Sequence, residues 1–251
     1  MKVRQLLTAL ILTFVSTILS ASGAGSVSLL PVKINVNDKA ALQRGAQFFM
    51  NYCSGCHSLR YLRYNRMARD LGLTTFTGEV DDDLLVNNLI FTSAKIADPI
   101  QISMPASEAR KWFGVAPPDL SLIARVRSAS WLYTYLKSFY GDQSRPFGAN
   151  NHLIPDVAMP NILQPLIDPG SREKMSAEAF DRTLQDLVTF LVYTSEPDQL
   201  IRYRLGGWVL GFLCFFLILC YGLKKIYWQK NSLCHPREGG DPSIKQGKAP
   251  I

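Results

Sequence analysis

Histidine and cysteine are scarce in this chain, with three histidines and five cysteines among 251 residues. Beyond a single Cys-x-x-Cys-His run there is no second Cys-x-x-Cys pair and no His-x-x-x-His pair. Because a structural zinc site needs four such ligands, the sequence disfavours a zinc module. The three remaining cysteines, Cys214, Cys220 and Cys234, lie in or after a long apolar run. No disulfide is predicted for them.

The sequence also lacks internal repeats and any persistent alternation of apolar and polar residues that would indicate strands. Helical spacing is present instead, and a first helix is predicted over Lys39–Tyr52. A longer helix is predicted to begin near Ser176, which can cap it, and to end at Glu196-Pro197. Shorter helices are expected over 82–91 and 130–139, separated by long loops rich in Pro and Gly. The fold class is therefore predicted as mostly α.

The middle of the chain has no excess of basic residues, although the whole chain carries a formal net charge of +7. Residues 25–200 hold 17 Lys/Arg and 18 Asp/Glu. The surplus of positive charge lies in the two ends, around the apolar segments. This distribution indicates membrane topology and argues against a nucleic-acid partner.

The N-terminal end has the features of an export signal. Lys2 and Arg4 precede an apolar run over 6–19, and Ser22-Gly23-Ala24 provides a small-residue cleavage site. The run is short for an uncleaved membrane anchor. A signal peptide is therefore predicted over residues 1–24, and the chain that follows should be exported.

A second apolar run, over 205–223, contains no charged residue and is long enough to cross a bilayer as a helix. Basic residues are more numerous on its C-terminal side, which places that side in the cytoplasm. The predicted layout is a periplasmic domain over 25–200, a transmembrane helix with its flanks over 201–228 and a disordered cytoplasmic tail over 229–251. The protein would thus cross the inner (cytoplasmic) membrane once.

The Cys53-Ser54-Gly55-Cys56-His57 run is the attachment motif of a c-type haem. Two cysteine sulfurs at this spacing can form thioethers with the two vinyl groups of one haem. The histidine that follows then lies under the ring, where its imidazole can bind iron. We therefore expect one covalent haem c, with Cys53, Cys56 and His57 among its ligands.

The second axial ligand of such a haem is commonly a methionine, and the chain contains six. Met104 and Met159 each precede a proline in a predicted loop, from which a thioether can reach over the ring. Position favours Met159, which comes shortly before the last predicted helix of the head. On the residues alone, Met104 is a serious alternative and His152 a lesser one.

Longer stretches of the sequence resemble the cytochrome c1 family, the haem subunits of the cytochrome bc1 complex (ubiquinol–cytochrome c reductase). The resemblance covers about residues 35–228. Its most specific part is the run Pro117-Pro-Asp-Leu-Ser followed by Arg125. The other matching stretches are Cys53-Ser-Gly-Cys-His-Ser-Leu-Arg-Tyr, Trp131-Leu-Tyr-Thr-Tyr-Leu, Asn150-Asn151, Ala158-Met159-Pro160 and Ser195-Glu-Pro.

The resemblance implies a class I cytochrome c-like haem domain with long loop insertions and one C-terminal transmembrane helix. It implies that Met159 is the axial methionine and that Arg125 pairs with a haem propionate. It further implies that Pro117 and Trp131 pack against the ring. The predicted haem-binding residues are therefore Cys53, Cys56, His57, Met159, Arg125, Pro117 and Trp131, with His57 and Met159 on the iron.

The function implied by the resemblance is electron relay from a Rieske iron–sulfur protein to a soluble cytochrome c or an equivalent carrier. The expected partners are cytochrome b, the Rieske protein and membrane lipid, and the chain itself would be a non-catalytic subunit of an oxidoreductase. One alternative is the haem c subunit of another membrane dehydrogenase or oxidase. A second alternative is a gas sensor or peroxidase, in which one axial position stays open.

Overall fold

The computed structural model describes residues 28–234; the predicted signal peptide and the last residues of the chain lie outside this range. The chain divides into a head that ends at Pro197 and a second unit that begins at Asp198. The elements in chain order are α2 (Lys39–Tyr52), β1 (Leu59–Arg63), α3 (Tyr64–Leu71), α4 (Asp82–Asn88), β2 (Pro99–Ile100), α5 (Ala106–Phe113), α6 (Ile123–Val126), α7 (Ala129–Lys137), β3 (Phe139–Gly141), β4 (Ala149–Asn151), α8 (Gln164–Ile167), α9 (Ala177–Ser195) and α10 (Gln199–Cys234).

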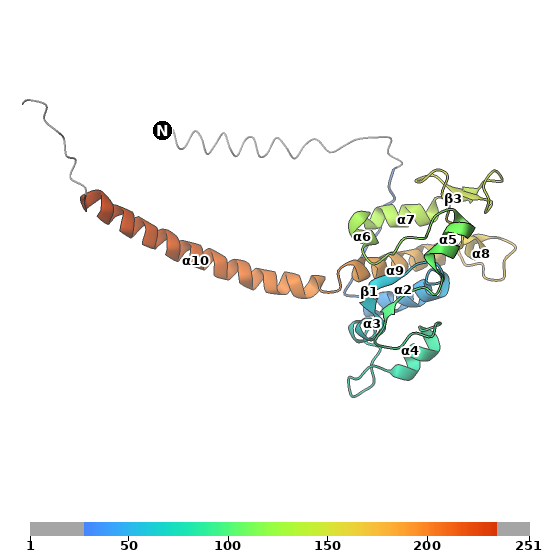
Figure 1. Cartoon of the computed structure of the whole chain (residues 1–251), viewed down its shortest axis with the longest axis horizontal. Coiled ribbons are helices and arrows are strands. Elements are labelled where there is room, and N and C mark those ends of the chain that lie inside the picture. Colours follow the sequence, from blue (N-terminus) through green and yellow to red (C-terminus); the bar gives the residue numbers. More distant parts are fainter. Residues whose placement is uncertain (1–27, 235–251) are drawn as a thin grey trace, which may run out of the picture. The chain divides into compact units, whose positions relative to one another are not determined.

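The head is mostly helical, as the sequence predicted, and the described β-structure consists of two short antiparallel pairs. One pair joins β1 to β2, and the other joins β3 to β4. The long α9 lies at the centre of the head, where it contacts α2, α6, α7 and α8 (Figure 1). Long irregular segments connect the shorter helices around this centre.

Capping side chains begin the helices at the predicted places. The Asp38 carboxylate accepts from the amide of Ala41 at the start of α2, and Ser176 Oγ accepts from the amide of Ala179 at the start of α9. Ser128 caps α7 in the same way. The predicted helices over 82–91 and 130–139 are confirmed as α4 and α7, each ending two or three residues earlier than expected.

The crossing of α2 and α9 is close because α2 presents a glycine at the contact. A Cβ added to Gly45 would overlap the carbonyl oxygen of Asp186 and lie 2.8 Å from the Cβ of Phe190. One helical turn further along α2, the rings of Phe49 and Phe190 lie 5.9 Å apart, and both side chains are fully buried. At Gly45 the two helix backbones therefore meet without an intervening side chain, and one turn away the two phenylalanine rings fill the interface.

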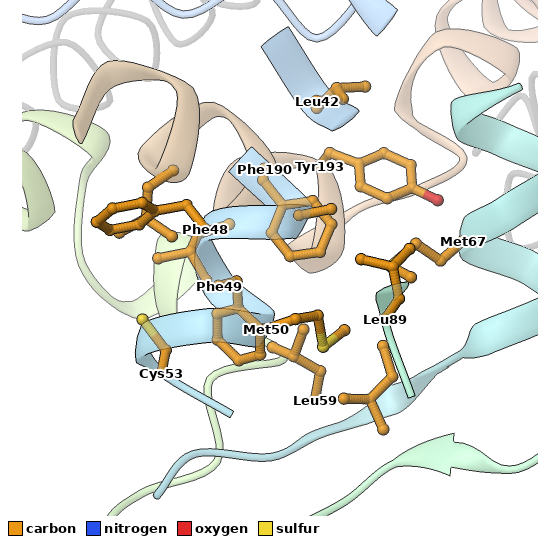
Figure 2. Packing of buried hydrophobic residues seen from close by; sticks show 14 of the residues in the cluster. Leu42, Phe48, Phe49, Met50, Cys53, Leu59, Met67, Leu89, Phe190 and Tyr193 are labelled. Carbon is orange, nitrogen blue, oxygen red and sulfur yellow. The ribbon is translucent and has the colours of Figure 1, made fainter. Parts of the chain in front are cut away.

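Around this crossing the buried apolar side chains form one cluster (Figure 2). Phe49 and Met50 of α2 pack in it with Met67 of α3, Leu59 of β1 and Phe190 of α9. Each of these five side chains is at least 97 % shielded from solvent. Cys53, at the end of α2, belongs to the same cluster, so the end of this helix is fixed by the core.

Helix α10 forms the described part of the second unit, and its stretch Gln199–Trp228 has a mean hydropathy of 2.1 over its most apolar window. At 1.5 Å per residue its 30 residues extend about 45 Å, more than the roughly 30 Å hydrocarbon core of a bilayer. Among the described residues, this is the one helix that is long and apolar enough to cross a membrane. It contains the predicted transmembrane run over 205–223.

We predict that Gly45→Ala destabilises the head by about 1–3 kcal/mol, because the added methyl group meets the backbone of α9 and not a movable side chain. Gly141→Ala is the matched control, since a Cβ at Gly141 has no heavy atom within 4 Å. Denaturant unfolding of the full-length protein in detergent measures both. Equal midpoints for the two variants would show that the close crossing is not needed for stability.

Candidate functional site

The head contains an apolar cavity of about 380 Å³. Its wall is assembled from the end of α2 and the motif after it, the segment before α6, the inner face of α7, the loop before α8 and the middle of α9. Its polar and sulfur-bearing lining residues are Tyr52, Cys53, Cys56, His57, Arg127, Trp131, Tyr135 and Met159. Most of the other lining residues are aliphatic, including Leu187 and Leu191 of α9.

The Cys-x-x-Cys-His run lies directly after α2 and turns onto the cavity wall. The amides of Cys56 and His57 both donate to the carbonyl of Cys53, at 3.1 and 2.8 Å. This turn brings Cys53, Cys56 and His57 to one side of the cavity. The structure thus places all three sequence-predicted residues together.

The imidazole of His57 is oriented by a backbone carbonyl. Its Nδ1 lies 2.8 Å from the oxygen of Pro118, and because a carbonyl can only accept, Nδ1 carries the proton. The unprotonated Nε2 is then available as a ligand. Burial of the ring lowers the pKa of His57, although the Pro118 carbonyl and the charge of Asp119 act in the opposite direction. The side chain is therefore held in the neutral form that binds a metal.

The segment that contains Pro118 is itself fastened to the motif. The amide of Leu120 donates to the carbonyl of Ser58 at 2.9 Å. The Asp119 carboxylate accepts from the amides of Arg60 and Ser121, at 3.0 and 2.9 Å. Pro117, predicted from the sequence to contact the ring, lines the cavity next to Pro118. These bonds fix the distance between the histidine and its carbonyl partner.

Both thiols of the motif are held in the protonated form. Burial, with a smaller contribution from Cys56, raises the pKa of Cys53 to about 12, and burial also raises the pKa of Cys56. A protonated thiol is a poor nucleophile and a poor ligand for a metal ion. The described residues also contain no cluster of three or more His, Cys, Asp or Glu side chains that could hold a bare metal ion.

Met159 is the methionine that reaches the cavity. It lies in the loop after β4, and its Sδ is 3.5 Å from the hydroxyl of Tyr135. Met104 is not among the residues that line the cavity, and neither is His152, whose ring stacks on Tyr140 at 4.4 Å. Of the three alternatives weighed from the sequence, the geometry favours Met159.

Two buried asparagines connect the Met159 loop to the rest of the head. Asn151 donates to the carbonyl of Tyr135 at 2.8 Å and accepts from the amide of Leu153 at 2.9 Å. Asn150 accepts from the amide of Asp156 at 2.9 Å. The loop that carries Met159 is therefore attached to α7, which forms the neighbouring wall.

Arg125 and Trp131, two further residues predicted to contact the haem, differ in where they lie. Trp131 lines the cavity, whereas Arg125 does not; its guanidinium lies 2.7 Å from the carboxylate of Glu196 at the end of α9. Arg127 lines the cavity in its place, with its guanidinium 4.8 Å from the centre of the Trp131 ring. Arg127 was not among the residues predicted from the sequence. It precedes the Ser128 cap of α7 in an extended conformation, so no helical spacing relates it to Trp131 and Tyr135.

The donors on this wall fit a c-type haem. The two thiols have the spacing of the attachment motif, an imidazole and a thioether supply a nitrogen and a sulfur ligand, and Arg127 supplies a cation for a carboxylate. The remaining surface is apolar, as a porphyrin requires. A structural zinc site, in contrast, would need a fourth ligand from His, Cys, Asp or Glu, and this wall provides none beyond Cys53, Cys56 and His57.

Comparison with known proteins identifies the relatives of this chain. Residues 33–231 match the Cytochrome C1 family. The chain is 45% identical over 248 residues to cytochrome c1 of Allochromatium vinosum, covering 90% of this chain and 98% of the relative. It is 42% identical over 220 residues to a protein of Nitrosomonas europaea named ammonia monooxygenase gamma subunit, covering 83% of this chain and 91% of the relative.

Among solved structures, the chain resembles one from a hyperthermophilic respiratory complex III. The TM-score is 0.46 at 15% sequence identity, and the likeness covers 90% of this chain and 96% of the other.

Proposed function

The chain belongs to the cytochrome c1 family, and on that premise we propose that it holds one covalent haem c in the described cavity and relays electrons within a quinol–cytochrome c reductase. The observation that carries the proposal is the cavity wall itself. It gathers Cys53, Cys56, His57 and Met159 from segments as far apart as 106 positions in the sequence, on an otherwise apolar surface.

Each of these residues has a distinct role in the proposal. Cys53 and Cys56 anchor the group through thioethers, and His57 donates Nε2 because its Nδ1 proton is bound to Pro118. Met159 would bind the iron through its sulfur. The haem would supply an iron that takes up and releases one electron. The apolar side chains from α7 and α9 exclude water, and with His57 and Met159 both bound to the iron, no site would be left open for a gas or peroxide.

The cation that faces a propionate is assigned here to Arg127. The resemblance suggested Arg125, but that guanidinium is engaged with Glu196, whereas Arg127 reaches the cavity two residues further on. A propionate near the Trp131 ring would find the Arg127 guanidinium already held over that ring.

For partners, we propose a Rieske iron–sulfur protein as electron donor, a soluble cytochrome c or equivalent carrier as acceptor, and cytochrome b as the membrane neighbour. Family membership supports this assignment. The length and hydropathy of α10 support a single membrane crossing. We further propose that the head lies on the periplasmic side and the C-terminus in the cytoplasm, which the basic residues after the apolar run support.

As a second candidate function, the chain would be the haem subunit of another membrane oxidoreductase. The name of the Nitrosomonas europaea relative favours it, since that name refers to an ammonia monooxygenase. The cavity would carry the same haem in either complex, so the two candidates differ in partners and not in the site.

We predict that Met159→Leu keeps the covalent haem but loses the Met–Fe(III) charge-transfer band near the red end of the spectrum. Because a thioether favours ferrous iron, the midpoint potential should fall by more than about 59 mV, a factor of ten for one electron. Quinol–cytochrome c activity should be lost. Met104→Leu is the control and should retain the band, because Met104 does not line the cavity. Loss of the band in the control alone would refute the ligand assignment.

A second pair of variants tests the propionate cation. Arg127→Gln removes a positive charge from the cavity wall, which stabilises the oxidised haem. The midpoint potential should therefore fall by about 40 mV, which corresponds to a free energy on the order of 1 kcal/mol for one electron. Arg125→Gln breaks the pair with Glu196 and should leave the potential near that of the wild type. Redox titration of the purified proteins distinguishes them. A larger fall in the Arg125 variant would return the role to that residue.

The complex is identified by what purifies with the tagged full-length protein from detergent-solubilised membranes. We expect a cytochrome b and a Rieske protein, together with antimycin-type-inhibitable reduction of cytochrome c by quinol. Recovery with monooxygenase subunits, and without cytochrome b, would replace the proposed complex by the second candidate.

A further inference from the structure

One hydrogen bond joins two walls of the cavity. The hydroxyl of Tyr135, on α7, donates to Sδ of Met159, on the loop before α8, at 3.5 Å. Both residues line the cavity. The sulfur that we propose as an iron ligand thus already accepts a hydrogen bond from the protein.

The Tyr135 ring is held from several sides, so that the direction of its hydroxyl is fixed. The ring stacks on Trp131 with centroids 5.1 Å apart and an interplanar angle of 7°, and it meets the edge of Phe139 at 5.2 Å. Its backbone carbonyl accepts from Asn151, which belongs to the strand before the Met159 loop. Tyr135 is therefore bonded to Met159 through its side-chain hydroxyl and to the strand before the Met159 loop through its backbone carbonyl.

We propose that Tyr135 is a positioning residue for the Met159 ligand. A thioether sulfur has two lone pairs, and the Tyr135 hydroxyl binds one of them, which leaves the other for the iron. This inference rests on the proposed function, because it requires Met159 to be an axial ligand. It predicts both an orientation and an electronic effect.

The electronic effect follows from the direction of the O–H dipole. A donor that points at sulfur withdraws electron density from it, and ferric iron depends on that density more than ferrous iron does. The hydrogen bond should therefore favour the reduced haem and raise its potential. Hydrogen bonding to an axial ligand is a recognised means by which a protein sets haem potential.

Tyr135→Phe tests the proposal because it removes the hydroxyl and keeps the ring that stacks on Trp131. Tyr133→Phe is the matched control on the same helix. Tyr133 is buried, its hydroxyl lies 3.5 Å from Nζ of Lys137, and it does not line the cavity. Each full-length variant is purified in detergent with its haem, and its midpoint potential and near-red charge-transfer band are measured against the wild type.

In the Tyr135→Phe protein we expect the band to persist but to move to longer wavelength, because the sulfur lone pair rises in energy. At a fixed ambient potential the ratio of reduced to oxidised haem should fall at least about threefold, which is about 28 mV for one electron. The Tyr133→Phe protein should match the wild type in both measurements, which separates the effect from a general loss of packing.

The outcomes separate this inference from the proposed function. If the wild type itself lacks the charge-transfer band, Met159 is not the ligand and the proposed site fails first. If the wild type has the band but Tyr135→Phe leaves its position and the potential unchanged, or raises the potential, the role of Tyr135 is overturned and the ligand assignment stands.

Discussion

The close crossing of α2 and α9 is the contact on which the site depends. Because Gly45 lets the backbones of the two helices approach each other closely, the end of α2 is fixed against the middle of α9. The attachment motif begins at that end, and Leu187 and Leu191 of α9 form part of the cavity wall. The same contact therefore builds the core and sets where Cys53 can lie. A wider crossing would separate the motif from the wall that α9 provides.

The long elements of the fold were predictable because their signals are local. The bounds of α2 follow from its apolar spacing and the Asp38 cap, and those of α9 from the Ser176 cap and Pro197. The apolar length of the C-terminal segment likewise indicated α10. The short strand pairs were not predicted, because segments of two to five residues carry too little alternation to be recognised.

The site was predictable where a motif fixes it and less so where tertiary packing decides. The Cys-x-x-Cys-His run located three residues, and the resemblance to the family selected Met159 over Met104. The cation was the weaker inference, because Arg125 and Arg127 differ by two positions and only the path of α6 shows which one reaches the cavity. The hydrogen bond from Tyr135 to Met159 had no sequence signal, since it joins elements 24 positions apart.

The proposed site requires a haem that is bound covalently to Cys53 and Cys56 on the cavity wall. The most direct measurement is mass spectrometry of a tryptic digest of the purified, denatured protein. Cleavage after Arg44 and Arg60 releases one peptide that contains the whole motif. This peptide should carry the mass of one haem, through two thioether bonds, even after acid-acetone extraction. A motif peptide with two free thiols, and haem in the extract, would rule out covalent attachment.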